Sequence, residues 1–113
     1  MPETAAPSDI VEQYFARMRA RDASVVDLFH EDAELVGLGT RRQGREAILD
    51  FYSGVIERAA PTPSLVGSLL VDGGRVAAEI VIELADGATV HAVDMFAIEQ
   101  GRIRSLTYFI ASE

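Results

Sequence analysis

Residues 87–98 restrict the fold more than any other stretch, because they place an acid inside a strand-like pattern. The stretch is rich in β-branched and aromatic residues, which favour a β-strand. Since side chains alternate between the two faces of a strand, Asp94 is predicted to share a face with Ala92 and Phe96. A carboxylate on a buried face is costly unless it is paired, hydrogen-bonded or protonated. Asp94 therefore marks either a polar site or a buried structural contact, such as a salt bridge to an arginine.

Composition excludes several classes of function. The 113 residues suffice for one domain with its own core. The absence of cysteine excludes disulfides, thiolate nucleophiles and cysteine-based metal sites. A net charge of -8 argues against nucleic acid as a partner, since phosphate binding needs a basic surface. With no secretory pattern and no apolar run long enough to span a bilayer, we expect a cytoplasmic domain without a membrane partner.

Three helices are predicted in the first half of the chain. Residues 1–7 read as a disordered tail, and the first helix starts at Ser8 or Asp9. Its apolar residues recur at helical spacing and form one face: Ile10, Val11, Tyr14, Phe15 and Met18. A short second helix is expected to start at Asp22 and to end near residues 30–32. A third follows Gly44 and stops before the prolines of residues 60–63.

The remaining segments read as strands. Residues 33–38 form a short strand, residues 40–43 a polar loop, and the chain after residue 64 a meander. The expected strands of the meander are residues 65–71, 75–85, 87–98 and 102–111, joined by short turns that contain glycine.

This order predicts one α+β domain over residues 8–113, with three N-terminal helices packed on the concave face of a curved mixed or antiparallel sheet. A sheet curled around a long helix leaves a conical cavity. Strand alternation and the apolar face of the third helix point several apolar side chains into it, which we read as core residues first and substrate-binding residues second. These residues are Leu35, Phe51, Val55, Ile80, Leu106, Tyr108 and Ile110.

Three segments carry a resemblance to a known superfamily: residues 29–35, residues 44–52, and residues 93–96 with 101–103. Together with the order of elements, they resemble the nuclear transport factor 2-like, or SnoaL-like, superfamily. The resemblance implies a cone-shaped, cystatin-like α+β roll. It does not fix an activity, because this fold carries many unrelated functions.

Within the superfamily, the chain is most similar to ketosteroid isomerases. That resemblance implies that Tyr14 and a protonated Asp94 are catalytic residues that hydrogen-bond a dienolate oxygen. It places Gly37 where the family has its catalytic base, and glycine can take no proton. Glu34 is predicted on the opposite face and Asp32 lies further back, so an aspartate introduced at residue 37 is expected to supply the missing base.

Two functions follow as expectations. The first is an isomerase or cyclase that binds a small hydrophobic carbonyl compound, steroid-like or polyketide-like, without a cofactor. The second is a non-catalytic binding or dimerisation module in which Tyr14 is simply a core aromatic. A homodimer is expected through the outer sheet face, at Val93, Met95, Thr107 and Phe109. No metal site is expected, because His30 and His91 lie far apart in the sequence.

Overall fold

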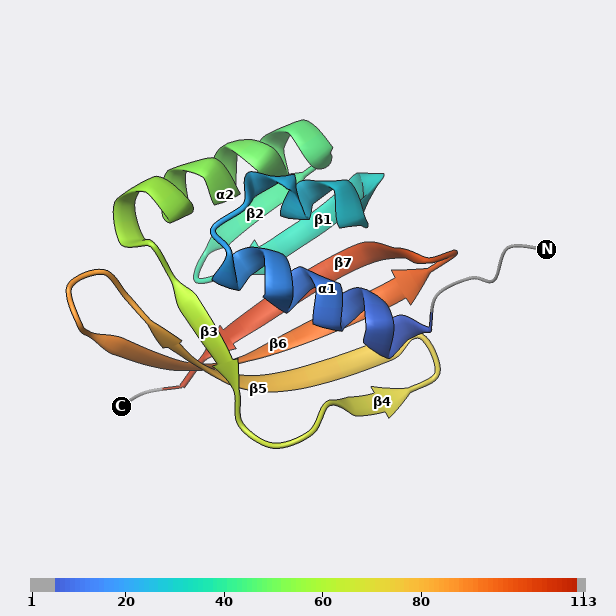
Figure 1. The fold of residues 1–113 in the computed structure, drawn as a ribbon. Helices are drawn as coiled ribbons and strands as arrows, with labels where there is room; N and C mark the ends of the chain where they lie inside the picture. The colour runs from blue at the N-terminus through green and yellow to red at the C-terminus, as the bar shows by residue number, and fades with distance from the viewer. Residues whose placement is uncertain (1–5, 112–113) are drawn as a thin grey trace.

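The computed structural model describes residues 6–111, in which helices and strands follow one another with short connections (Figure 1). The elements, in chain order, are α1 (Pro7–Arg19), the 3-10 helix η1 (Ala23–Leu28), β1 (Phe29–Gly37), β2 (Thr40–Gln43), α2 (Arg45–Ala59), β3 (Thr62–Leu65), β4 (Leu70–Asp72), β5 (Arg75–Glu83), β6 (Thr89–Glu99) and β7 (Arg102–Ile110). The expected tail lies outside the described residues over positions 1–5, and α1 begins at Pro7.

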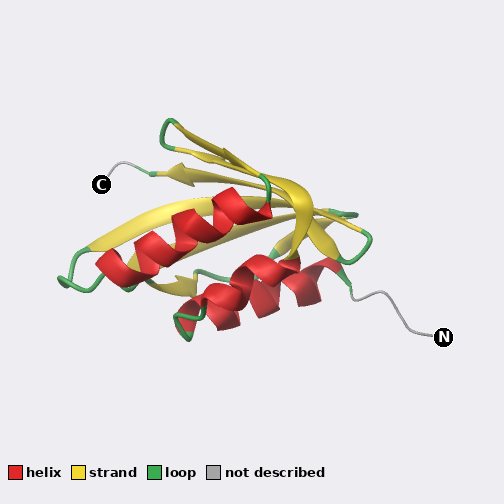
Figure 2. Cartoon of the chain, turned by 90° about the horizontal axis from the view of Figure 1, so that it is seen from above, coloured by secondary structure: helices red, strands yellow, loops and turns green. Residues whose placement is uncertain are grey.

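The strands form one curled, mixed sheet. Its order is β2-β1-β7-β6-β5-β3, and β4 also pairs with β5. β1 and β7 run parallel, whereas the other neighbours are antiparallel. The helices lie over the same face of this sheet (Figures 1 and 2), so that face carries the core. The α+β class and the curled sheet are as predicted.

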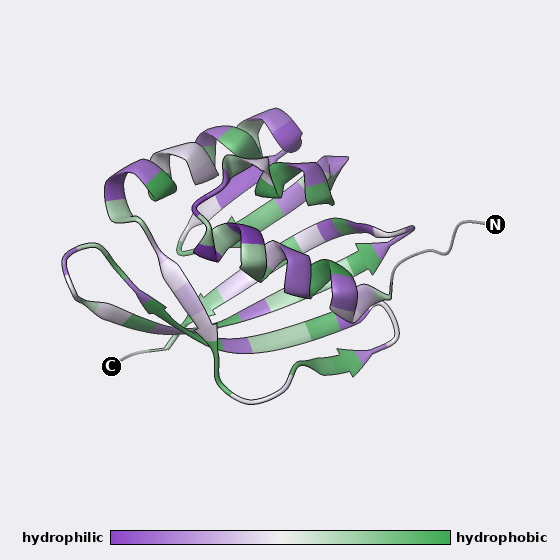
Figure 3. Ribbon diagram, in the orientation of Figure 1, coloured by the Kyte–Doolittle hydropathy of each residue, from purple (hydrophilic) through white to green (hydrophobic). Residues whose placement is uncertain are grey.

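The predicted apolar face of α1 is buried against β3, β5 and β6. α2 packs instead over β1 and β2, and its own residues Ile48 and Tyr52 are buried on the side that faces the sheet. Along both helices hydrophilic and hydrophobic segments alternate, as expected for helices with one buried face (Figure 3). Three helices are present in the described chain, but α2 follows β1 and β2, so they do not all precede the sheet. No helix between residues 6 and 111 is long and apolar enough to cross a membrane.

Two boundaries near the short second helix differ from the prediction. The helix ends at Leu28 rather than near residues 30–32, and the following strand, β1, begins at the completely buried Phe29 rather than at residue 33. The helix itself is a 3-10 helix whose Asp22 cap accepts a hydrogen bond of 2.9 Å from the Ser24 N–H.

The segments around the edges of the sheet also differ. Residues 40–43 form the edge strand β2 rather than a loop, pairing with residues 34–37 through the tight turn at Leu38 and Gly39. All four β2 side chains are polar and none is fully buried, so the alternation that signals a strand is absent. Residues 65–71 are not one strand, because β3 and β4 pair separately with β5 on either side of a bend.

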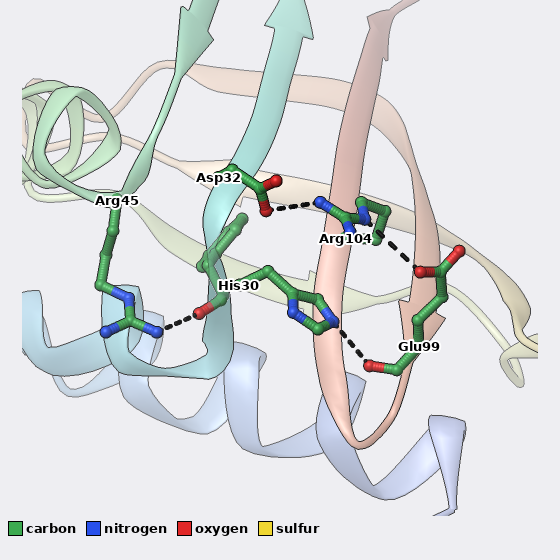
Figure 4. A network of polar contacts seen from close by, with 6 residues as sticks. His30, Asp32, Arg45, Glu99 and Arg104 are labelled. Carbon is green, nitrogen blue, oxygen red and sulfur yellow. Dashed lines mark hydrogen bonds and ion pairs between the residues drawn. The ribbon is translucent and has the colours of Figure 1, made fainter.

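Polar contacts fasten β1 to its neighbours in the sheet (Figure 4). Arg104 on β7 donates to Asp32 on β1 at 2.6 Å and lies 3.4 Å from the Glu99 carboxylate on β6. His30, which the sequence places at a helix end, lies on β1 with its Nε2 2.7 Å from the Glu99 carbonyl oxygen. Exposed pairs of this kind contribute about 0–1 kcal/mol each, so they define register more than they stabilise the fold.

Arg45 ties the start of α2 to β1. Its guanidinium donates a hydrogen bond of 2.8 Å to the Phe29 carbonyl oxygen (Figure 4). This contact orients α2 over the sheet, and the next two turns of the helix carry Phe51 and Tyr52 toward the inner face.

Candidate functional site

A cavity of about 160 Å³ lies between the inner face of the sheet and the two α-helices. Most of its lining is apolar and comes from α1, α2, the residue after α2, and strands β5, β6 and β7. The lining residues are Tyr14, Met18, Phe51, Tyr52, Val55, Pro61, Ile82, Ala92, Asp94, Leu106, Tyr108 and Ile110. A larger depression of about 650 Å³ at the start of α2 is lined mainly by exposed and charged residues. We take the smaller cavity as the site, because it contains the only buried charged residue in the described chain, Asp94.

Asp94 lies on the inner face of β6 between Ala92 and Phe96, as alternation predicts, and its side chain is only 6 % exposed. Burial raises the pKa of the Asp94 carboxyl to about 7, and no hydrogen bond or cation from the described residues offsets this effect. No salt bridge within the described residues therefore compensates for the burial of the Asp94 carboxyl. Near neutral pH a large share of Asp94 is protonated and can donate a hydrogen bond.

Tyr14 and Tyr52 form a second polar group in the cavity. Their hydroxyl oxygens are 2.7 Å apart, and either hydroxyl can be the donor. Burial raises the pKa of both phenols well above the ordinary value, so both remain neutral. The Tyr14 ring is fixed edge-on against Phe15 and Phe96, with centroid distances of 5.0 and 5.1 Å. When Tyr52 donates to Tyr14, the Tyr14 proton is free for a ligand in the cavity.

The space over Gly37 is filled by Tyr108. A Cβ atom at residue 37 would lie 2.5 Å from the Tyr108 ring, a separation that real Cβ atoms essentially never show. The φ angle of Gly37 is not in the left-handed region, so close approach rather than backbone conformation requires glycine here. An aspartate at residue 37 would therefore collide with Tyr108, and it could act as a base only after that ring had moved.

The other acids of β1 lie away from the cavity. Glu34 forms an ion pair with Arg41 of β2, and Asp32 binds Arg104. Arg104 holds the pKa of the Asp32 carboxyl below its usual range. Among the described residues that line the cavity, Asp94 is thus the only carboxylate, and none is a histidine.

Five of the seven expected substrate-binding residues line the cavity: Phe51, Val55, Leu106, Tyr108 and Ile110. Leu35 is completely buried in the core and does not reach it. Ile80 lines an adjoining void of about 40 Å³ beneath α1, whose lining also includes Tyr14 and Asp94. The prediction of cavity contact was wrong for Leu35, because alternation identifies the inner face but not which part of it is covered by a helix.

Tyr52 is the site residue that sequence reasoning missed. It falls on the apolar face of α2, where its ring alone explains its position. A signal was present, since a buried tyrosine hydroxyl needs a partner and Tyr14 was the other inward-facing phenol on a helix.

Comparisons with known proteins identify the family and the fold of the chain. The family model for the SnoaL-like domain matches residues 11–106. Among proteins with curated descriptions, none matches the chain significantly.

Similar solved structures cover nearly the whole chain. A candidate polyketide cyclase from Sinorhizobium meliloti is 27% identical, with a TM-score of 0.81 over 88% of this chain and 93% of that one. A candidate ketosteroid isomerase from Kribbella flavida is 20% identical, with a TM-score of 0.84 over 95% and 78% of the two chains. A protein with a cystatin-like fold from Methylobium petroleophilum is 16% identical, with a TM-score of 0.84 over 98% and 79%. The last two share the fold with this chain, and that likeness says nothing of activity.

The raised pKa of Asp94 predicts a specific loss of stability with pH. The native state keeps its Asp94 proton up to about pH 7, whereas the unfolded chain loses it near 3.8. The free energy of unfolding is therefore highest below about pH 4, where Asp94 is protonated in both states. It falls by about 4 kcal/mol as pH rises through 7. Urea unfolding across this range should show it in the wild type, and the Asp94→Asn variant should lack it. Parallel pH profiles for the two proteins would show that Asp94 does not titrate in this way.

Proposed function

Because the chain belongs to the SnoaL-like domain family, we propose that its cavity binds a small hydrophobic carbonyl compound. Tyr14 and Asp94 are assigned as the two donors to the carbonyl oxygen. The observation that supports this most directly is the buried Asp94 carboxyl, which lines an apolar cavity without an internal partner. A ligand oxygen that accepts its proton would satisfy the group, and such placement of a perturbed acid is typical of functional sites.

The chemistry best suited to this pair is stabilisation of an enolate. When a proton leaves the carbon beside a carbonyl group, negative charge develops on the oxygen. Neutral donors fixed in a cavity with little water bind that charge more strongly than they bind the starting carbonyl, which lowers the barrier. Such an enolate can be reprotonated at another carbon, giving isomerisation, or attack a second carbonyl group, giving cyclisation.

The proton acceptor in this scheme is not a side chain of the described cavity. Gly37 stands at the usual base position, and Asp32 and Glu34 of β1 form ion pairs outside the cavity. A water molecule or a basic group of the substrate would take the proton. For the same reason the second candidate is a non-catalytic module that binds the same carbonyl compounds but leaves them unchanged.

Binding of a phenol tests the donor assignment, because a phenol oxygen can occupy the place of an enolate oxygen. Tyr14→Phe and Asp94→Ala should each weaken phenol binding in calorimetry by about tenfold, the loss of roughly one net hydrogen bond. Wild-type affinity should also fall as pH rises above about 7, because ionised Asp94 cannot donate. Leu38→Ala, in an exposed turn outside the cavity, is the matched control and should bind normally. Unaltered binding in both donor variants would refute the assignment.

We also propose that a second copy of this chain covers the outer face of β6 and β7. Val93 lies opposite Phe109 and Met95 opposite Thr107 in the β6–β7 register, so the four side chains form one uncharged patch. Phe109 is 57% exposed, which is unusual for a large aromatic residue and typical of an interface anchor. At one edge of the patch, the Glu79 carboxylate lies 2.7 Å from His91 Nε2, at hydrogen-bond distance.

Sedimentation equilibrium tests this dimer. The wild type should have twice the mass of the chain, and Phe109→Glu should raise the dimer dissociation constant by about a hundredfold, or roughly 3 kcal/mol. Leu38→Glu introduces the same charge at another exposed apolar residue and should leave the dimer intact. A monomeric wild type, or a Phe109→Glu variant that remains dimeric, would contradict the proposal.

A further inference from the structure

The volume of the cavity sets a limit on its ligand. At about 160 Å³, the cavity holds about half of the roughly 300 Å³ at which pockets for drug-sized ligands begin. An apolar cavity of about 150 Å³ in other proteins holds one benzene ring. The space enclosed beside Tyr14 and Asp94 is therefore about that of a single six-membered ring, with a further void of about 40 Å³ lined by the same two residues under α1.

Tyr108 is the residue that sets this limit. Its ring rests directly on the backbone of Gly37, where any side chain would displace it. On the α2 side, the Phe51 ring lies 6.5 Å from it at an interplanar angle of 30°. Phe51 is itself covered by Arg42, whose guanidinium carbon lies 5.7 Å from the ring centroid. The Tyr108 ring is thus supported by β1 and α2, and it forms a fixed wall of the cavity.

Gly37 has the complementary role. Because it has no side chain, the Tyr108 ring can sit close to β1 and leave the cavity open. A methyl group at residue 37 would push this ring away from β1, and the cavity on its other side would shrink. The two residues therefore act as a pair, one forming the wall and the other fixing where the wall stands.

We propose that Gly37 and Tyr108 together restrict this site to compounds with a single ring that bears a carbonyl or phenol oxygen. Tyr108 is the specificity-determining residue, and it acts through the size of its ring. Substituents on the bound ring would extend past Ile110, which is partly exposed beside the cavity. The inference rests on the proposed function, since it assumes that the ligand oxygen binds at Tyr14 and Asp94.

Calorimetry with phenol and naphthol tests the size limit directly. Wild-type protein should bind phenol at least tenfold more tightly than naphthol, because the second ring collides with Tyr108. Tyr108→Ala should reverse this order, since the second ring can occupy the space that the tyrosine ring leaves. Tyr108→Phe keeps the ring and removes the hydroxyl, so it should retain the preference of the wild type.

Gly37→Ala tests the pair independently, without a substitution at residue 108. It should weaken phenol binding by at least tenfold, and combining it with Tyr108→Ala should restore binding and admit naphthol. Val36→Ala, the neighbouring position on the opposite face of β1, is the matched control and should change neither affinity.

The outcomes separate the two proposals. Equal binding of phenol and naphthol to the wild type, or an unchanged preference in Tyr108→Ala, overturns the size limit while the proposed function stands. Absence of binding of either compound to the wild type and to every variant overturns the proposed function and the size limit with it.

Discussion

The burial of one carboxyl group, that of Asp94, is the constraint around which this molecule is arranged. An acid that is 6 % exposed and has no internal partner costs the fold several kcal/mol whenever it is ionised. The cost is tolerable because the group keeps its proton up to about pH 7. The surrounding elements provide this environment: α1 places Tyr14 beside the cavity, α2 places Tyr52 against Tyr14, and most of the remaining lining is apolar.

A second contact, between Tyr108 and Gly37, shapes the cavity next to Asp94. The structure places Tyr14 on α1 and Asp94 on β6, and membership of the SnoaL-like domain family accounts for the fold. It does not fix the chemistry, because the same roll carries many activities. Here an aromatic ring fills the space over Gly37, and the described cavity lining contains the Tyr14 hydroxyl and the Asp94 carboxyl but no second carboxylate.

Residue spacing along the sequence correctly predicted which side chains face the core, because that depends only on the local period of a strand or helix. Alternation put Asp94 on the inner face of β6, and helical spacing put Tyr14 on the buried face of α1. The edge strand β2 escaped prediction because all of its residues are polar and no face of it is fully buried. The pairing of Tyr108 with Gly37 also escaped, because it depends on β1 and β7 running side by side although they are far apart in the sequence. Leu35 shows the same limit, since only the position of the helices decides which inner-face residues reach the cavity.

The protonation state of Asp94 can be observed directly through the chemical shift of its carboxyl carbon in isotope-labelled protein, assigned by comparison with Asp94→Asn. A titration from about pH 3 to about pH 9 spans both the ordinary and the raised pKa of an aspartic acid. We predict a midpoint at about 7. A midpoint near the ordinary value of about 3.9 would mean that Asp94 is ionised in the folded protein, and the assignment of this residue as a neutral donor would be wrong.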